Sequence, residues 1–248
     1  MSVWDELVGQ EEAIEVFRAA AQSELAEATT HESAMTHSWL VTGPPGSGRS
    51  NLAYAFASAL LCREGGCGQC SDCKQVAAKT HPDLATLTTE RVIISIDEVR
   101  ELVQSSQYSP AVSRYRVIVI EDADRMAERT SNVLLKALEE PPERTVWILC
   151  APSEADLIPT IRSRVRSVRL RVPSVESVSA LLQQRDDVDA ATAERAARHA
   201  QSHIGMAHRL ATNSEAAERR DETVQLALNI RGVRDAVMAA ARMLEIAT

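Results

Sequence analysis

One short glycine-rich stretch constrains the fold of this chain more than any other part of its sequence. It runs from Gly43 to Ser50, after an apolar run and before a helical pattern of residues. Glycines are needed where backbone N–H groups turn inward around an anion, because a Cβ atom there would block the turn. The helix that follows points its positive N-terminal end at the same anion. The stretch therefore predicts a strand, a phosphate-binding loop and a helix in succession.

One position of this loop departs from the usual pattern. The predicted nucleotide-binding residues are Gly43, Pro44, Gly46, Ser47, Gly48, Arg49 and Ser50. Ser50 stands where a hydroxyl would ligate Mg²⁺, and Arg49 stands where the pattern expects lysine. Arginine is a wide planar fork, whereas lysine is a compact point charge that reaches between phosphates. The stretch indicates descent from a nucleotide-binding loop rather than a plain turn, and it leaves open whether ATP still binds.

Four cysteines follow the helix of the loop at short intervals: Cys62, Cys67, Cys70 and Cys73. Thiolates brought together by tight turns suit tetrahedral Zn²⁺, which accepts soft sulfur ligands. The alternatives are disulfides, which a chain without an export signal disfavours, or ordinary core cysteines, which would not cluster in a glycine- and charge-rich segment. Four cysteine ligands leave no position for water, so the zinc ion would be structural. Cys150 lies alone in a strand pattern and is predicted to be a core residue.

A β-branched run over residues 115–120 predicts a central strand of a parallel sheet, buried on both faces. The run ends in Glu121 and Asp122. Acidic residues at the carboxyl end of such a strand lie in the crevice where α/β folds bind ligands. In a nucleotide site the first would hold Mg²⁺ and its neighbour would polarise water. The alternative is a solvated acidic turn.

Strands alternate with helices through the first two thirds of the chain, which predicts an α/β fold with a parallel sheet. Further strands are expected over 84–87 and 146–150, helices over 94–104 and 130–138, and a loop over 29–36. Ser95 and Glu98 have the spacing of a capping box at the start of the first of these helices. Pro173 marks a domain boundary, and helical patterns follow it to the end of the chain.

Five arginines crowd the segment 160–171: Arg162, Arg164, Arg166, Arg169 and Arg171. One interpretation is a solvated strand edge. The other is that one of them enters the nucleotide site of a neighbouring subunit, where a guanidinium stabilises developing phosphate charge as an arginine finger.

Composition narrows the class of protein. The chain has 248 residues, 45% of them hydrophobic and 25% charged, as in ordinary soluble globular proteins. Its net charge of -8 argues against a surface that coats nucleic acid. No apolar run approaches the ~18 residues of a membrane span, and the N-terminus lacks the basic and apolar regions of a secretory signal. We therefore expect a cytoplasmic protein without a membrane partner.

Taken together, the order and spacing of these motifs resemble the bacterial clamp-loader branch of the AAA+ ATPases. The likeness covers about residues 1–212 and includes the runs 121–126, 132–142 and 161–165 besides the loop and the cysteines. It implies a RecA-like αβα domain over 1–172 with the zinc insertion at about 62–73. It also implies a small all-helical lid domain over 173–212, with 213–248 as the start of a missing or truncated helical collar domain.

The resemblance also implies a role. In the family a Ser-Arg-Cys motif supplies the arginine finger, and its arginine corresponds to Arg164, with Val165 in place of the cysteine. Active loader ATPases carry lysine at Arg49 and Asp-Glu at residues 121–122. They also have a polar sensor at residues 151–152, here Ala-Pro, and a second sensor arginine where this chain has His208. These four departures predict a subunit that does not hydrolyse ATP.

The function that the resemblance implies is a non-hydrolysing stator of the sliding-clamp loader of DNA polymerase III, in DNA replication. Arg164 would act in trans on a neighbouring ATPase. The partners in this hetero-oligomer would be the gamma/tau ATPase and delta, with the sliding clamp and primed DNA engaged through the complex. The alternative is an ATP-hydrolysing motor subunit of the same loader. A small-molecule P-loop kinase is the weaker third hypothesis, because the four-cysteine insertion counts against it.

Overall fold

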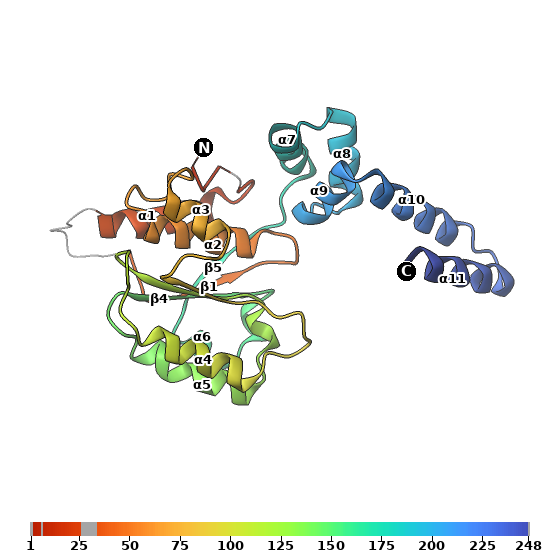
Figure 1. Ribbon diagram of the computed structural model, residues 1–248. Coiled ribbons are helices and arrows are strands. Elements are labelled where there is room, and N and C mark those ends of the chain that lie inside the picture. Colours follow the sequence, from red (N-terminus) through yellow and green to blue (C-terminus); the bar gives the residue numbers. More distant parts are fainter. Residues whose placement is uncertain (1, 6, 26–33, 248) are drawn as a thin grey trace. The chain divides into compact units, whose positions relative to one another are not determined.

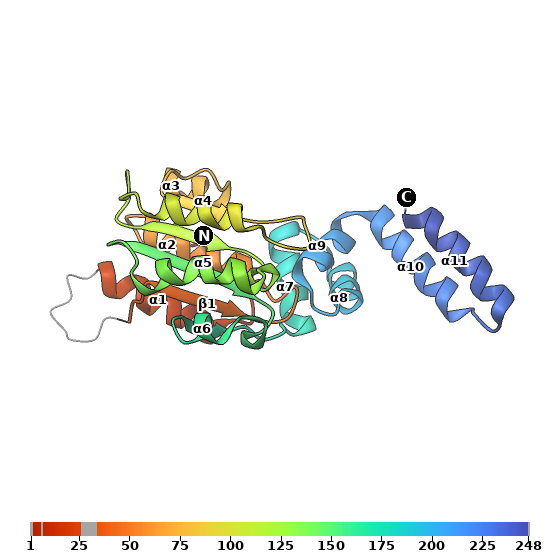
Figure 2. The same ribbon diagram turned by 90° about the horizontal axis from the view of Figure 1, so that it is seen from below.

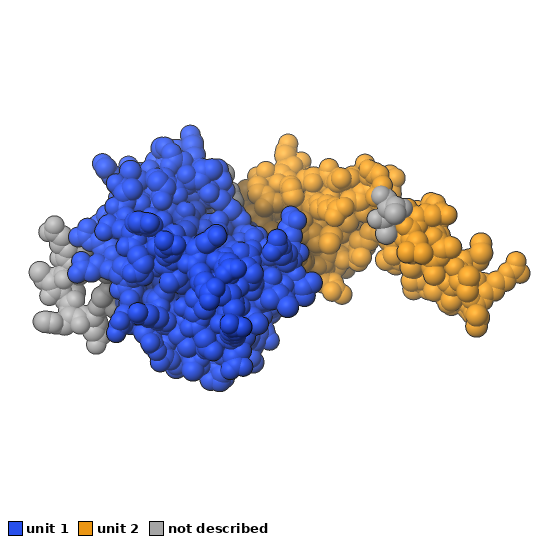
Figure 3. Space-filling model, turned by 60° about the horizontal axis from the view of Figure 1, so that its bottom comes forward, with its two compact units in different colours: residues 1–173 blue, residues 174–248 orange. Residues whose placement is uncertain are grey.

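The chain divides into two compact units, Met1–Pro173 and Ser174–Thr248 (Figure 3). The computed structural model describes residues 2–5, 7–25 and 34–247. Most of the loop expected over 29–36 lies outside the described residues.

The first unit is built on a parallel five-stranded sheet with the strand order β2-β3-β4-β1-β5. The strands are β1 Ser38–Thr42, β2 Leu84–Leu87, β3 Arg116–Ile120, β4 Thr145–Ala151 and β5 Arg166–Arg169. The helices are α1 Glu11–Leu25, α2 Arg49–Leu61, α3 Ser71–Ala77, α4 Ile96–Ser106, α5 Glu128–Glu139 and α6 Pro159–Arg162. Helices α1 to α3 cover one face of the sheet and α4 to α6 cover the other (Figure 1, Figure 2). The predicted α/β, RecA-like three-layer fold is confirmed.

Two apolar layers, one on each face of the sheet, hold this unit together. Successive residues of β1 alternate between them, with Trp39 in the layer below α1 and α2 and Leu40 in the layer below α4 and α5. Phe17 and Phe56 pack against Trp39, with ring centroids 4.9 Å and 5.5 Å from the tryptophan. Such aromatic pairs add to the free energy of simple burial. Three of the few aromatic residues therefore anchor one layer. Cys150 is buried in the same layer, as predicted.

Local signals fix where the helices begin. Ser95 accepts a hydrogen bond from the backbone N–H of Glu98, and the Glu98 carboxylate accepts one from the backbone N–H of Ser95. This confirms the predicted capping box of α4. Helix α2 begins directly after Gly48, whose φ of 90° lies in the left-handed region that glycine adopts at little cost.

The second unit is all-helical. Its helices are α7 Val175–Asp186, α8 Ala190–His199, α9 Ile204–Thr212, α10 Ser214–Leu228 and α11 Val233–Ala247. The first three pack through small and aliphatic side chains such as Leu182, Ala197 and Ala207. The last two helices are separated by residues 229–232, which include a glycine. Within the described part of the chain, no helix is both long and apolar enough to cross a membrane.

Candidate functional site

The glycine-rich loop lies at the carboxyl end of β1, between Thr42 and the first residue of α2. A Cβ atom at Gly43 would lie 2.7 Å from Ser47 Oγ and 2.8 Å from Leu170 Cβ, so only glycine fits there. The backbone N–H of Ser47 donates to the carbonyl of Pro44 at 3.1 Å. This backbone N–H group therefore forms a hydrogen bond within the loop itself.

Arg49 folds back across this loop. Its Nη1 donates a hydrogen bond to the carbonyl oxygen of Gly43, and its Nη2 lies 3.8 Å from Asp122 Oδ1. The side chain is only 13% exposed. The guanidinium thus joins the two ends of the loop instead of extending along a line of phosphates.

Glu121 follows β3 and is held by side chains from three other parts of the chain. Its carboxylate accepts hydrogen bonds from Ser50 Oγ at 2.6 Å, Tyr54 Oη at 2.7 Å, Lys79 Nζ at 2.7 Å and Thr88 Oγ1 at 2.9 Å. Burial alone would raise the pKa of this carboxyl, but these four donors lower it to about 2. Burial and the adjacent Glu121 carboxylate raise the pKa of the Tyr54 phenol. Glu121 is therefore ionised, and all four of these donors belong to its own chain.

Asp122 is the second acidic residue, and it lies between two arginines. Its carboxylate is 3.8 Å from Arg49 Nη2 and 3.5 Å from Arg125 Nη2. Its backbone is left-handed, with φ 50°. The negative charge of Asp122 is therefore balanced inside the chain.

The residues of this site do not fit a Mg²⁺–nucleotide in the arrangement they have. Such a site needs a cation aimed at the phosphates and carboxylate oxygens free to bind Mg²⁺ or its water ligands. Here Arg49 bonds to Gly43, and both carboxylates already face cations of the chain. After β4, the nearest hydroxyl is that of Ser153, which caps a short helical turn by accepting the backbone N–H of Ala155. The structure brings all the predicted nucleotide-site residues together, but their charged side chains are paired with other groups of the same chain.

Arg164 lies at the amino ends of the parallel strands, opposite the glycine-rich loop at their carboxyl ends. It precedes β5. A five-residue strand such as β1 spans roughly 15 Å. Arg164 Nε donates to Glu139 Oε1 at 2.8 Å, and Nη2 lies 2.6 Å from the same oxygen.

His208, the residue at the expected position of the second sensor arginine, belongs to the second unit. Its Nδ1 lies 2.8 Å from Asp186 Oδ2.

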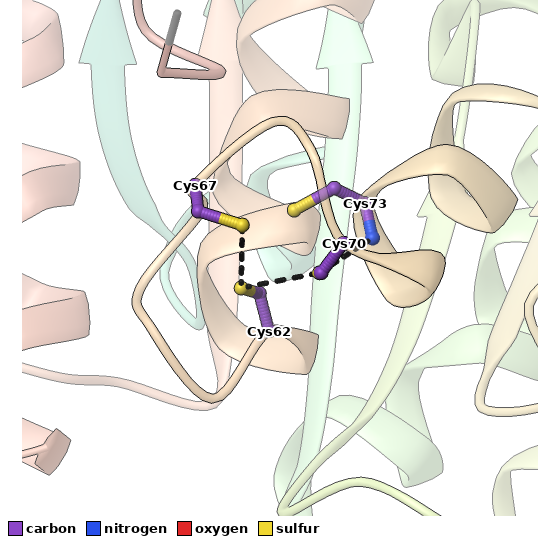
Figure 4. Close-up of side chains that lie close together, drawn as sticks. All are labelled: Cys62, Cys67, Cys70 and Cys73. Atoms are coloured by element: carbon purple, nitrogen blue, oxygen red, sulfur yellow. Dashed lines mark hydrogen bonds between the residues drawn. The ribbon is translucent and has the colours of Figure 1, made fainter.

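The four clustered cysteines converge between α2 and α3 (Figure 4). The sulfur atoms of Cys62, Cys67, Cys70 and Cys73 all lie within 4.8 Å of one another. Cys62 Sγ is 3.8 Å from Cys67 Sγ and 3.6 Å from Cys70 Sγ. Sulfurs at tetrahedral corners around Zn²⁺, each at about 2.3 Å, would be roughly 3.8 Å apart. The cluster therefore fits a metal ion.

Backbone N–H groups contact three of these sulfurs. N–H groups of Glu64, Gly68 and Cys73 point at cysteine sulfurs at 3.4 Å each. Burial would raise the pKa of the Cys62 thiol, but the backbone N–H groups around it lower that pKa to about 7. The pKa of Cys73 is raised by burial and by the neighbouring thiols, and the pKa of Cys70 is also raised, so without a metal ion Cys62 is the thiolate of these three. Metal-binding cysteines need this thiolate form.

Three residues of the site were not predicted from the sequence. Tyr54, Lys79 and Thr88 belong to none of the recognised motifs, and only the tertiary fold places them beside Glu121. A fourth residue outside the predictions is Gln10, whose amide donates to the carbonyl of Arg171 at 2.8 Å and accepts from its backbone N–H at 3.1 Å. That amide ties the segment before α1 to the segment after β5.

The sequence profile of the family described as "DNA polymerase III, delta subunit" matches residues 18–174. The delta' subunit of Pseudomonas aeruginosa is 39% identical over 134 residues, which is 52% of this chain and 41% of that protein. The delta' subunit of Escherichia coli K12 is 34% identical over 143 residues, 55% of this chain and 43% of that protein. The gamma/tau subunit of Mycobacterium tuberculosis is 31% identical over 153 residues, 60% of this chain and 26% of that protein. The matches thus span less than half the length of these relatives.

Solved structures with the same fold include two from Thermotoga maritima. A gamma subunit-related protein of DNA polymerase III has a TM-score of 0.51 at 22% identity, covering 94% of this chain and 71% of that one. The Holliday junction branch migration motor RuvB has a TM-score of 0.56 at 17% identity, covering 95% of this chain and 70% of that one. At these identities the likeness concerns the fold alone.

Proposed function

Because the chain belongs to the DNA polymerase III delta-subunit family of AAA+ clamp-loader proteins, and within it is most like the delta' subunits, we propose that it is a non-hydrolysing stator of the sliding-clamp loader. It would belong to the DNA polymerase III holoenzyme and act in DNA replication. Its direct neighbours would be gamma/tau and delta subunits. The sliding clamp and primed DNA would be engaged through the complex.

The main support for the non-hydrolysing role is that the charged side chains of the nucleotide site are paired with other groups of the same chain. Phosphoryl transfer is catalysed by cations aimed at the phosphates and by a carboxylate-held Mg²⁺. Arg49 is turned onto Gly43, and Glu121 accepts four hydrogen bonds from its own chain, one of them from the Lys79 ammonium. An ATP-hydrolysing motor would need both groups free, so this arrangement disfavours the motor alternative.

The position of Arg164 supports an action in trans. It stands about one strand length from the loop of its own chain, too far for a side chain to reach a phosphate bound there. Its guanidinium is 34% exposed, and Glu139 holds it in one orientation. A neighbouring subunit that packs against the amino ends of the strands would face the guanidinium of Arg164, held in this orientation.

The cysteine cluster supports a structural Zn²⁺ ion. Cys62 ends α2, and Cys70 caps the start of α3, so one ion would bind the two helices together. All four ligand positions would be sulfurs, and none would remain for water or substrate. The zinc ion would therefore stabilise the insertion without taking part in a reaction.

The test of the arginine finger is Arg164→Ala in a reconstituted loader whose other ATPase sites have been inactivated. Turnover at the neighbouring site should fall on the order of 10³-fold, the effect typical of losing such a finger. Arg162→Ala, which removes an exposed arginine two residues earlier, is the matched control and should leave turnover unchanged. Wild-type turnover in the Arg164→Ala loader would reject the finger. ATP hydrolysis by the isolated chain, abolished by Glu121→Gln, would instead support the motor alternative.

A further inference from the structure

Lys79 stands at a position where glycine is the favoured residue. Helix α3 ends in a Schellman motif, in which the backbone N–H of Lys79 donates to Val76 at 2.9 Å and that of Thr80 donates to Gln75 at 2.8 Å. This motif requires a left-handed residue, and Lys79 has φ 57°. A residue with a Cβ atom adopts that conformation at a cost in free energy. A lysine here needs a compensating interaction.

The side chain of Lys79 has such an interaction. Its ammonium lies 4.7 Å from the centre of the Tyr54 ring and 2.7 Å from Glu121 Oε1. Ser50, Tyr54, Lys79 and Glu121 share the wall of a cavity of about 540 Å³. The ammonium is therefore bound to the same carboxylate as Ser50, and Ser50 and Glu121 are the two side chains from which a Mg²⁺ site would be built.

The carboxylate of Glu121 already accepts four hydrogen bonds, three of them on Oε1. A carboxylate offers about four lone-pair positions. Oε1 accepts hydrogen bonds from Tyr54, Lys79 and Thr88, and Oε2 accepts one from Ser50. A divalent ion could bind Oε1 only by displacing a donor, and the like charge of the Lys79 ammonium would oppose its approach to either oxygen.

We propose that Lys79 is a built-in cation that takes the place of a nucleotide-bound divalent ion on Glu121. The inference rests on the proposed non-hydrolysing role and names a residue that enforces it. Lys79 follows α3, whose start carries Cys70 and Cys73. The cysteine-bearing insertion would thus position Lys79 in the nucleotide site, in addition to holding α2 and α3 together.

The test compares ATP binding by Arg49→Lys and by Arg49→Lys/Lys79→Gly, with and without added Mg²⁺, by calorimetry on the zinc-loaded full chain. Arg49→Lys restores the expected loop lysine, and glycine suits the left-handed position of residue 79, so both variants should fold. Arg49→Lys/Lys74→Ala is the matched control, because Lys74 is an exposed lysine of α3, the helix that precedes Lys79. Circular dichroism and zinc content verify folding.

We expect added Mg²⁺ to tighten ATP binding at least about tenfold in Arg49→Lys/Lys79→Gly and to have no effect in Arg49→Lys or the control. Equal Mg²⁺ dependence in Arg49→Lys with and without Lys79, including none in either, would overturn the inference. This result is independent of the Arg164→Ala experiment. Failure of the stator role and failure of the Lys79 role can therefore be told apart.

Discussion

At the scale of single residues, the orientation of the Arg164 side chain depends most on its contacts with Glu139. Besides its two contacts to Glu139, its Nη1 donates to the carbonyl of Thr160 at 2.8 Å and to Ser163 Oγ at 3.0 Å. The two charged side chains are 34% and 44% exposed, so their ion pair contributes only about 0–1 kcal/mol to stability. The contact matters for orientation, because a group that acts on a transition state must be held in place.

We therefore predict that Glu139→Gln lowers ATP turnover at the neighbouring site of the reconstituted loader about tenfold, with the KM for ATP unchanged. The thermal midpoint of the isolated chain should change little, since the pair is exposed. Glu140→Gln, at the exposed next residue, is the control. If turnover rises in Glu139→Gln, then Glu139 restrains Arg164 from the phosphates rather than orienting it.

At the scale of elements, a buried carboxylate fastens the segment between α4 and β3 to the start of β2. Asp83 has no exposed surface, and its carboxylate accepts the backbone N–H groups of Ala111 at 2.5 Å, Val112 at 2.9 Å and Ser113 at 2.7 Å. Burial raises the pKa of Asp83, but these three donors outweigh it and hold the pKa below its usual range. Because the folded-state pKa is depressed, the stabilisation is complete above the unfolded pKa of about 3.9 and is lost as pH falls through the folded value.

Asp83→Asn should therefore destabilise the first unit by about 2–3 kcal/mol at pH 7, since an amide cannot accept three N–H donors with a full charge. It should also remove part of the loss of stability seen in the wild type below about pH 4. Urea unfolding at a series of pH values measures both effects. Asp97→Asn, at a carboxylate that is 82% exposed, is the control and should shift neither. A variant as stable as the wild type would show that the three hydrogen bonds are not needed.

The same scale shows why some of the structure was predictable from the sequence. The capping box of α4 and the alternating layers of β1 depend on residues a few positions apart, so periodicity and spacing reveal them. The pair of Lys79 and Glu121 spans 42 residues and exists only because the fold brings the segment after α3 beside the residue that follows β3. The rotamer of Arg49 likewise depends on the carbonyl and carboxylate around it. Residue identity therefore predicted the location of the site, and tertiary contacts decided its state.

At the scale of the whole molecule, the cysteine insertion joins parts of the first unit that are distant in sequence. It lies between α2 and α3, and the carbonyl of Gly66, inside it, accepts the backbone N–H of Val3 at 3.1 Å and the hydroxyl of Ser2 at 3.2 Å. A metal ion there would brace the N-terminal residues, the helix of the loop and the helix that leads to Lys79. The sheet has its own two apolar layers, so it does not depend on the ion for its core.

We predict one zinc ion per chain by metal analysis, lost in Cys67→Ser and retained in Cys150→Ala, whose cysteine lies outside the cluster. Removing the ion should lower the thermal midpoint by about 10 °C without unfolding the sheet. An ion present at about 1,000 times its Kd contributes about 4 kcal/mol, and each kcal/mol shifts a domain of this size by about 2–4 °C. Complete unfolding on chelation would mean that the two apolar layers are insufficient alone. A well-folded wild-type chain purified without zinc would refute the metal site itself.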